Sequence, residues 1–200
     1  MNARYKATEK ENRQLRGTLG DVVITNGPYN EAGGAYTFYG TESNYIEFPN
    51  KGGLDTRLSI TLMCWVQPGG QDGPLFSYGV SDSTVCIWIY SGRFFNRIIK
   101  HQSLQTLTTI TTEVLPAGEW VHVAASYDHN SRNNLLYING HLRAWQNIGT
   151  SYGVLSVSRR VRMGVDDVSN SYFKGKIAEM KVYNVALNET HIQTSIIQGN

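Results

Sequence analysis

Short β-type segments, separated by residues that favour turns, follow one another through most of the 200-residue chain. LSITLMCWVQP (58–68), TVCIWIY (84–90) and WVHVAASYD (120–128) are rich in β-branched and aromatic residues. Clusters of Gly, Asn, Asp, Ser and Pro stand between such segments. This pattern predicts an all-β fold, in which two antiparallel sheets pack as a jelly-roll sandwich.

The clearest local pattern is a three-stranded unit in residues 118–145. Apolar residues recur at every second position from Val121 to Ala125, which places them on one face of a strand. Asn139-Gly140 indicates a two-residue hairpin turn, because both residues tolerate positive φ. The histidines of this unit fall at three separate places, so they predict neither a zinc site nor an active site.

One short helix is predicted near the C-terminus. Asn188 is suited to cap its first turn, and Ile192 and Ile196 are four residues apart, as a single buried stripe requires. No internal repeat, low-complexity tract or linker divides the chain. We therefore expect a single domain over residues 1–200.

Composition excludes several classes of function. A net charge of +2 with 17% charged residues gives no basic surface for nucleic acid. No run approaches the roughly 20 apolar residues of a membrane span, so membrane insertion is not expected. The two cysteines, Cys64 and Cys86, suit neither a disulfide framework nor a zinc site. We expect both to be buried and unpaired.

Several segments, in order along the chain, resemble laminin G-like domains of the concanavalin A-like jelly-roll superfamily, which also contains the pentraxins. They are AYTFYGTESNYIEFPN (35–50), SITLMCWVQP (59–68), GPLFSYG (73–79), WVHVAASYDHNSRNNLLYINGHL (120–142) and YFKGKIAEMKVYNVALNETHI (172–192). The resemblance spans about residues 17–195, and we expect the family's first strand to be truncated in this chain. It implies a module that binds glycans, proteins or calcium in an extracellular or cell-surface protein.

Catalysis is not expected from the sequence. GTSYG (149–153) matches the G-x-S-x-G pattern of hydrolases, but a strand-like segment follows it where that chemistry requires a helix. Glycosidases need two carboxylates across the scissile bond. In related jelly-roll glycosidases they lie on one strand that reads E-x-D-x-E or E-x-D-x-x-E, and this sequence has no such strand. A glycoside-active enzyme therefore remains a remote alternative.

The resemblance also implies one structural calcium ion. By position, its ligands would be Glu9, the backbone carbonyl of Gly40 and Glu179. Asp166 and Asp167, in the acidic turn GVDDVSNS (164–171), offer a second possible site. Carboxylate and carbonyl oxygens are the ligands that calcium prefers.

Aromatic side chains at strand ends and loops are the candidate glycan contacts, because sugar C–H faces stack on exposed rings. The candidates are Tyr90, Phe94, Trp145 and Tyr152, with Arg93 to meet a carboxylate or sulfate. The other tryptophans, Trp65, Trp88 and Trp120, are expected in the core.

These observations predict a non-catalytic recognition module that binds a glycan or a glycosaminoglycan. A protein–protein adhesion or structural module is the alternative, with a second copy of the chain among its possible partners.

Overall fold

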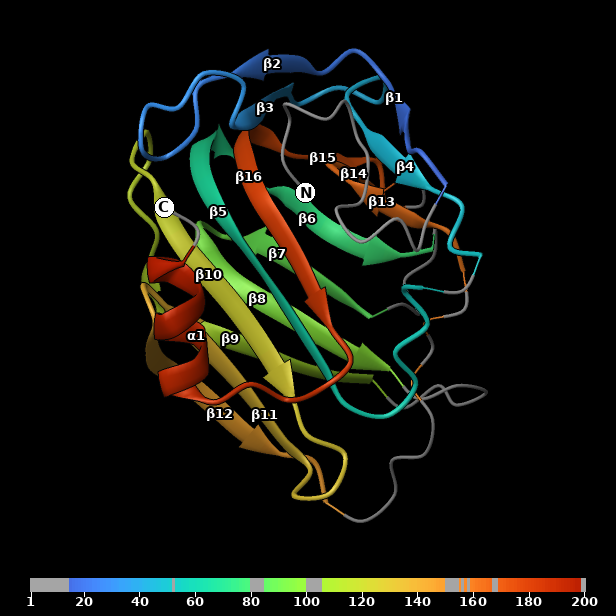
Figure 1. The fold of residues 1–200 in the computed structure, drawn as a ribbon, viewed down its shortest axis with the longest axis vertical. Helices are drawn as coiled ribbons and strands as arrows, with labels where there is room; N and C mark the ends of the chain where they lie inside the picture. Colours follow the sequence, from blue (N-terminus) through green and yellow to red (C-terminus); the bar gives the residue numbers. More distant parts are fainter. Residues whose placement is uncertain are drawn as a thin grey trace.

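The protein is described by a computed structural model in which two large antiparallel sheets pack face to face and one short helix lies outside them (Figure 1). The predicted jelly-roll sandwich is thereby confirmed. The structure describes residues 15–51, 53–79, 85–99, 106–149, 155, 157, 159–166 and 169–198. Among these residues, no helix is long and apolar enough to cross a membrane.

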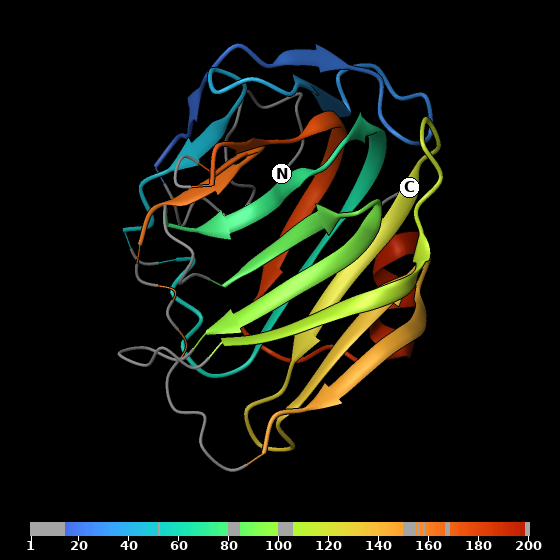
Figure 2. The same ribbon diagram turned by 180° about the vertical axis from the view of Figure 1, so that it is seen from behind.

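Each large sheet has seven strands. Sheet A has the order β1 (Thr18–Leu19), β4 (Ile46–Phe48), β13 (Val161–Met163), β6 (Gly73–Tyr78), β7 (Cys86–Tyr90), β8 (Arg93–Ile99) and β9 (Thr106–Val114). Sheet B has the order β12 (His141–Asn147), β11 (Asn133–Ile138), β10 (Val121–Tyr127), β5 (Ile60–Gln71), β16 (Lys174–Tyr183), β3 (Ala35–Tyr39) and β2 (Val23–Thr25). Sheet B faces the viewer in Figure 1 and sheet A in Figure 2. A small hairpin, β14 (Val165–Asp166) with β15 (Ser171–Tyr172), forms a separate two-stranded sheet that packs against β6.

The predicted three-stranded unit is confirmed as β10, β11 and β12. β10 pairs with β5 on one side, with His122 opposite Trp65, and with β11 on the other. Asn139 (φ 50°) and Gly140 (φ 79°) form the tight turn before β12. Positive φ at both central residues matches the right-handed twist of the hairpin.

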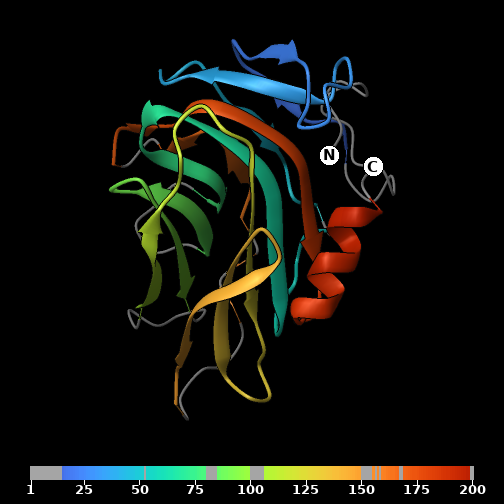
Figure 3. The same ribbon diagram turned by 90° about the vertical axis from the view of Figure 1, so that its left-hand side faces the viewer.

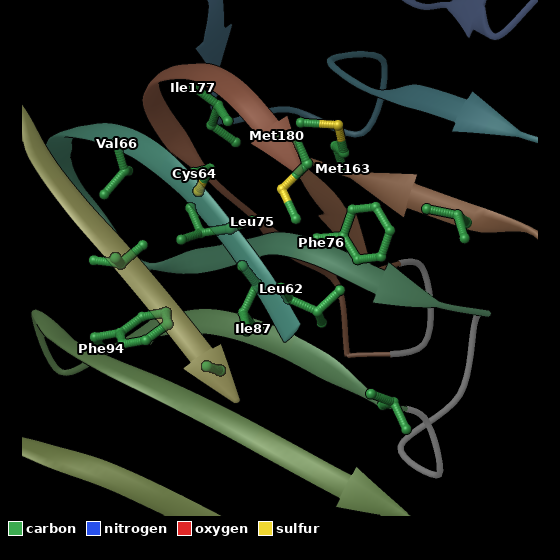
Figure 4. Packing of buried hydrophobic residues seen from close by; sticks show 14 of the residues in the cluster. Leu62, Cys64, Val66, Leu75, Phe76, Ile87, Phe94, Met163, Ile177 and Met180 are labelled. Atoms are coloured by element: carbon green, nitrogen blue, oxygen red, sulfur yellow. The ribbon is translucent and has the colours of Figure 1, made fainter. Parts of the chain in front are cut away.

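The hydrophobic core lies between the sheets (Figure 4). Leu62, Cys64 and Val66 of β5 point into it from sheet B, and they meet Ile87 of β7 and Phe94 of β8 from sheet A. All five side chains are at most 2% exposed. Each of the four hydrocarbon side chains among them contributes roughly 1.5–3 kcal/mol by leaving water.

One polar contact joins the two sheets inside this core. The side-chain amides of Asn96 (β8) and Asn134 (β11) donate to each other over 3.0 and 2.7 Å. Asn134 Nδ2 also donates to Thr109 Oγ1 at 2.9 Å. All three residues are buried. Buried amides are tolerated because they hydrogen-bond to one another.

The predicted helix is confirmed as α1 (Glu189–Ile197), which covers part of the outer face of sheet B (Figure 3). Asn188 Oδ1 accepts a hydrogen bond from the backbone N–H of His191 and so caps the first turn. Ile192 is fully buried in a second, smaller cluster that includes Met63 and Tyr137 of sheet B.

Both cysteines are buried and unpaired, as expected. Burial raises the pKa of each thiol, Cys64 and Cys86, to about 12. Neither thiol is therefore a reactive thiolate at neutral pH.

Candidate functional site

A groove opens on the outer face of sheet A, over the β7–β8 hairpin. In β7 the side chains of Ile87 and Ile89 point into the core. Trp88 and Tyr90 occupy the alternate positions of the strand and therefore face outward. Trp88 lies opposite Phe95 of β8 in the strand register. The two-residue period therefore brings three aromatic rings to one outer surface.

These rings form one wall of the groove. The centroids of the Tyr90 and Phe95 rings are 6.1 Å apart, with the ring planes tilted by 43°. Tyr90 is 59% exposed, whereas Trp88 and Phe95 are half-buried. Exposed aromatic faces of this kind present apolar area at fixed positions, because their side chains have few rotatable bonds.

Asp72 lines the groove from the connection between β5 and β6. Its Oδ1 accepts a hydrogen bond of 3.1 Å from the backbone N–H of Gly92. Gly92 (φ 70°) and Ser91 (φ 50°) form the tight turn of the β7–β8 hairpin. The carboxylate of Asp72 therefore holds the tip of the hairpin beside the groove.

The β14–β15 hairpin supplies further polar groups to the groove. Asp166 is only 6% exposed, and its Oδ2 accepts a hydrogen bond from Ser169 Oγ at 2.9 Å. Ser169 Oγ also lies 3.0 Å from Ser171 Oγ. All three side chains line the groove, so a buried carboxylate is held in place by a neighbouring hydroxyl.

Arg97 of β8 adds a positive charge to the groove. Its guanidinium carbon lies 5.8 Å from the centre of the Phe95 ring, within the range of a cation–π contact. The cavity has a volume of about 480 Å³, within the roughly 300–1,000 Å³ of small-ligand sites. These groups are suited to binding a ligand. The rings can contact its apolar faces, the carboxylates can accept hydrogen bonds from its donors, and the guanidinium can donate to its acceptors.

The structure brings two of the candidate residues, Tyr90 and Asp166, into this groove. Arg93 pairs with Tyr90 in the strand register but does not line the groove, and its Nη1 donates to the carbonyl of Ser91 at 3.3 Å. The expectation for Phe94 is wrong: its side chain is 0% exposed in the core, because Phe95 takes the outward position.

Trp145 lies elsewhere. Its partner across β11 and β12 is Leu135, which packs on the outer face of sheet B beneath α1. Cross-strand partners share a face, so Trp145, 64% exposed, is on the opposite outer face from the groove. Tyr152 falls outside the described residues.

The expectation that the other three tryptophans are core residues is also wrong. Trp65, Trp88 and Trp120 are half-buried, and Trp88 lines the groove. Sequence reasoning missed Trp88 and Asp72 as site residues. The sequence does contain a signal for Trp88. Apolar core residues alternate with other residues on both sides of the Ser91-Gly92 turn, and this alternation would have placed Trp88 outward beside Tyr90.

The calcium candidates do not gather in the described part of the chain. The Gly40 carbonyl accepts from Gln71 Nε2 at 3.1 Å, Glu179 pairs with Lys181 Nζ at 3.3 Å, and Asp166 lines the groove. Among the described residues, no three His, Cys, Asp or Glu side chains form a metal-binding group. Glu9 and Asp167 fall outside these residues, so calcium stays a prediction.

Comparison with known proteins points to one family. A family model described as the concanavalin A-like lectin/glucanases superfamily, named for laminin G, matches residues 40–193. Among curated proteins, none is a significant match.

Solved structures share the fold at low sequence identity. The binding domain of Paraclostridial Mosquitocidal Protein 1 superposes with a TM-score of 0.77 and 15% identity over 94% of this chain and 48% of that one. The binding domain of botulinum neurotoxin serotype G superposes with a TM-score of 0.72 and 15% identity over 92% of this chain and 46% of that one. The chain thus spans about half the length of these two domains. A heptameric SAP-like pentraxin from Limulus polyphemus superposes with a TM-score of 0.59 and 16% identity over 80% of each chain.

Proposed function

Because the chain belongs to the concanavalin A-like lectin/glucanases superfamily, we propose that it is a non-catalytic module that binds a glycan in the groove on sheet A. The observation that carries this proposal is the gathering of Trp88, Tyr90 and Phe95 with Asp72 and Asp166 around one cavity. Sugars offer an apolar C–H face and a rim of hydroxyls. The rings suit the first and the carboxylates the second.

Similar structures support binding as the kind of function. Two of them are the binding domains of toxins, and the third is a pentraxin. An extracellular or cell-surface location is part of the same proposal, since it is implied by the family resemblance. A structural calcium ion is also part of this proposal.

A glycan array tests the proposal. The purified chain is applied with calcium and again with chelator, and hits are titrated with the free oligosaccharide. We expect saturable binding that Tyr90→Ala and Trp88→Ala weaken at least tenfold, because each removes a ring from the groove. Trp145→Ala is the matched control, since it removes an exposed ring from the opposite face. Loss of binding in chelator alone would identify the predicted calcium ion.

Two results would contradict the proposal. The first is an array that stays silent in both buffers. The second is binding that Trp145→Ala abolishes and Tyr90→Ala leaves intact.

Protein–protein adhesion is a second candidate, favoured by β12. This strand is the edge of sheet B, and it exposes Trp145 and 41% of Leu142 on one face. Edge strands with exposed apolar side chains are available to pair with another chain. Light scattering of the wild type and of Trp145→Ala tests self-association. A dimer that this variant dissociates would favour the adhesion function.

The remote enzymatic alternative gains one observation, which is that Asp72 and Asp166 line the same groove. Incubating each bound oligosaccharide with the protein tests it, because a glycosidase would shorten the chain. We expect the oligosaccharide to be recovered intact.

A further inference from the structure

The described lining of the groove carries more acidic than basic side chains. Among the described residues, its charged groups are the carboxylates of Asp72 and Asp166 and the guanidinium of Arg97. These three groups sum to −1 at neutral pH. A ligand in the groove therefore meets a locally negative surface, although the molecule as a whole is weakly basic.

The two carboxylates differ in what they can accept. Asp166 is 6% exposed and already accepts from Ser169, so an anion placed beside it would face a carboxylate that water screens poorly. Asp72 is exposed and keeps its hydrogen bond to the Gly92 amide. Both oxygen pairs are acceptors, and hydroxyl groups of a ligand are the donors that match them.

The two nearby arginines do not reverse this balance. Arg97 lies over the Phe95 ring, with the two carboxylates in the same lining. Arg93 is turned to the carbonyl of Ser91 and is absent from the lining. Among the described lining residues, one guanidinium stands against two carboxylates, so they supply no surplus of positive charge for a sulfate.

We propose that the groove takes an uncharged saccharide and discriminates against sulfated and carboxylated glycans. This inference rests on the proposed function and narrows it, because it removes glycosaminoglycans from the predicted ligands. The rings of Trp88, Tyr90 and Phe95 contact the C–H face of the sugar, while Asp72 and Asp166 accept from its hydroxyls.

The test uses matched pairs of probes. Neutral β-1,4-linked hexasaccharides of glucose, mannose, galactose and N-acetylglucosamine are titrated beside their chemically O-sulfated forms. We expect at least one neutral probe to bind, and its sulfated form to bind at least tenfold more weakly. Binding of the neutral probe should change less than twofold between 50 and 500 mM NaCl, since no ion pair with the ligand is lost.

Asp72→Asn supplies the variant for the charge. Its amide oxygen still accepts from the Gly92 N–H, but the summed charge of the three groups becomes zero. The penalty against the sulfated probe, which is the ratio of its Kd to that of the neutral probe, should therefore fall at least threefold. Glu189→Gln is the matched control, because it removes one carboxylate from α1 on the opposite face. It should leave the penalty unchanged.

The outcomes separate this inference from the function on which it rests. Equal or tighter binding of a sulfated probe, still lost in Tyr90→Ala, overturns the inference and leaves a glycan-binding groove. If no probe binds, or if Tyr90→Ala leaves all binding unchanged, the result contradicts both the proposed function and the inference.

Discussion

His122 is a histidine that stays uncharged in the folded protein. It is 3% exposed in β10, and its ring meets that of Trp65 edge to face at 5.4 Å between centroids. Burial lowers the pKa of His122 to about 3, and the nearby positive charge of Lys181 adds to the effect. The side chain is therefore a packing residue, as its place in mid-strand requires.

This low pKa predicts a loss of stability in acid. In the unfolded chain His122 titrates near 6.5, so below that pH the unfolded state binds a proton that the folded state does not. The free energy of unfolding should then fall by up to about 1.4 kcal/mol per pH unit between pH 6.5 and about 3. Urea denaturation of the wild type and His122→Gln measures it. We expect the wild type to lose about 1.6 kcal/mol more than the variant between pH 6.5 and 5, and equal losses would contradict this.

Neighbouring residues show why a site is harder to predict than a strand. The segment RFFNRII (93–99) predicts β8 correctly, but a shift of one residue exchanges its two faces. Phe94 and Phe95 therefore have similar sequence surroundings, although Phe94 is buried in the core and Phe95 faces the groove. What decides between them is the opposing sheet, where the core lies, and this contact is not local in sequence.

At the scale of elements, α1 depends on its cap. Asn188 Oδ1 accepts from the His191 N–H, which otherwise has no partner within the helix. The capping residue and the position of Ile192 could both be predicted from sequence, because a helix start has a local signature. The strand neighbours could not, since β13 pairs with β4 and β6 from far along the chain.

Asn188→Ala should lower the free energy of unfolding by about 1 kcal/mol, because the variant loses the capping acceptor. Asn188→Asp keeps the acceptor and adds a negative charge at the positive end of the helix dipole, so it should stay within about 0.5 kcal/mol of the wild type. Chemical denaturation of both variants makes the comparison. An Asp variant as unstable as the Ala variant would show that the cap is not the cause.

At the scale of the whole molecule, the Asn96–Asn134 contact fixes how the two sheets sit against each other. A hydrophobic core tolerates sliding more readily than a pair of amides does, because each amide must keep its partner. Neither asparagine stands out in the sequence, and they are 38 positions apart. The groove has the same origin, since the β7–β8 and β14–β15 hairpins that line it are far apart in the sequence and the fold brings them together.

Asn96→Ala should cost about 2 kcal/mol of stability, because it leaves the buried amide of Asn134 short of a partner. The double variant Asn96→Ala/Asn134→Ala should cost less than the sum of the two single variants, by about 1 kcal/mol or more. Guanidinium unfolding of all four proteins gives the coupling energy. Strict additivity would mean that the two amides act independently.

The placement of the tryptophans gives the molecule a built-in optical readout. Trp88 lines the groove and Trp145 lies exposed on the opposite face. Indole emission responds to the polarity around the ring, and iodide quenches only indoles that it can reach. A ligand in the groove should shield Trp88 from iodide while Trp145 remains quenched, and a partner on β12 should do the reverse. The unlabelled protein can therefore report which of its two faces is occupied.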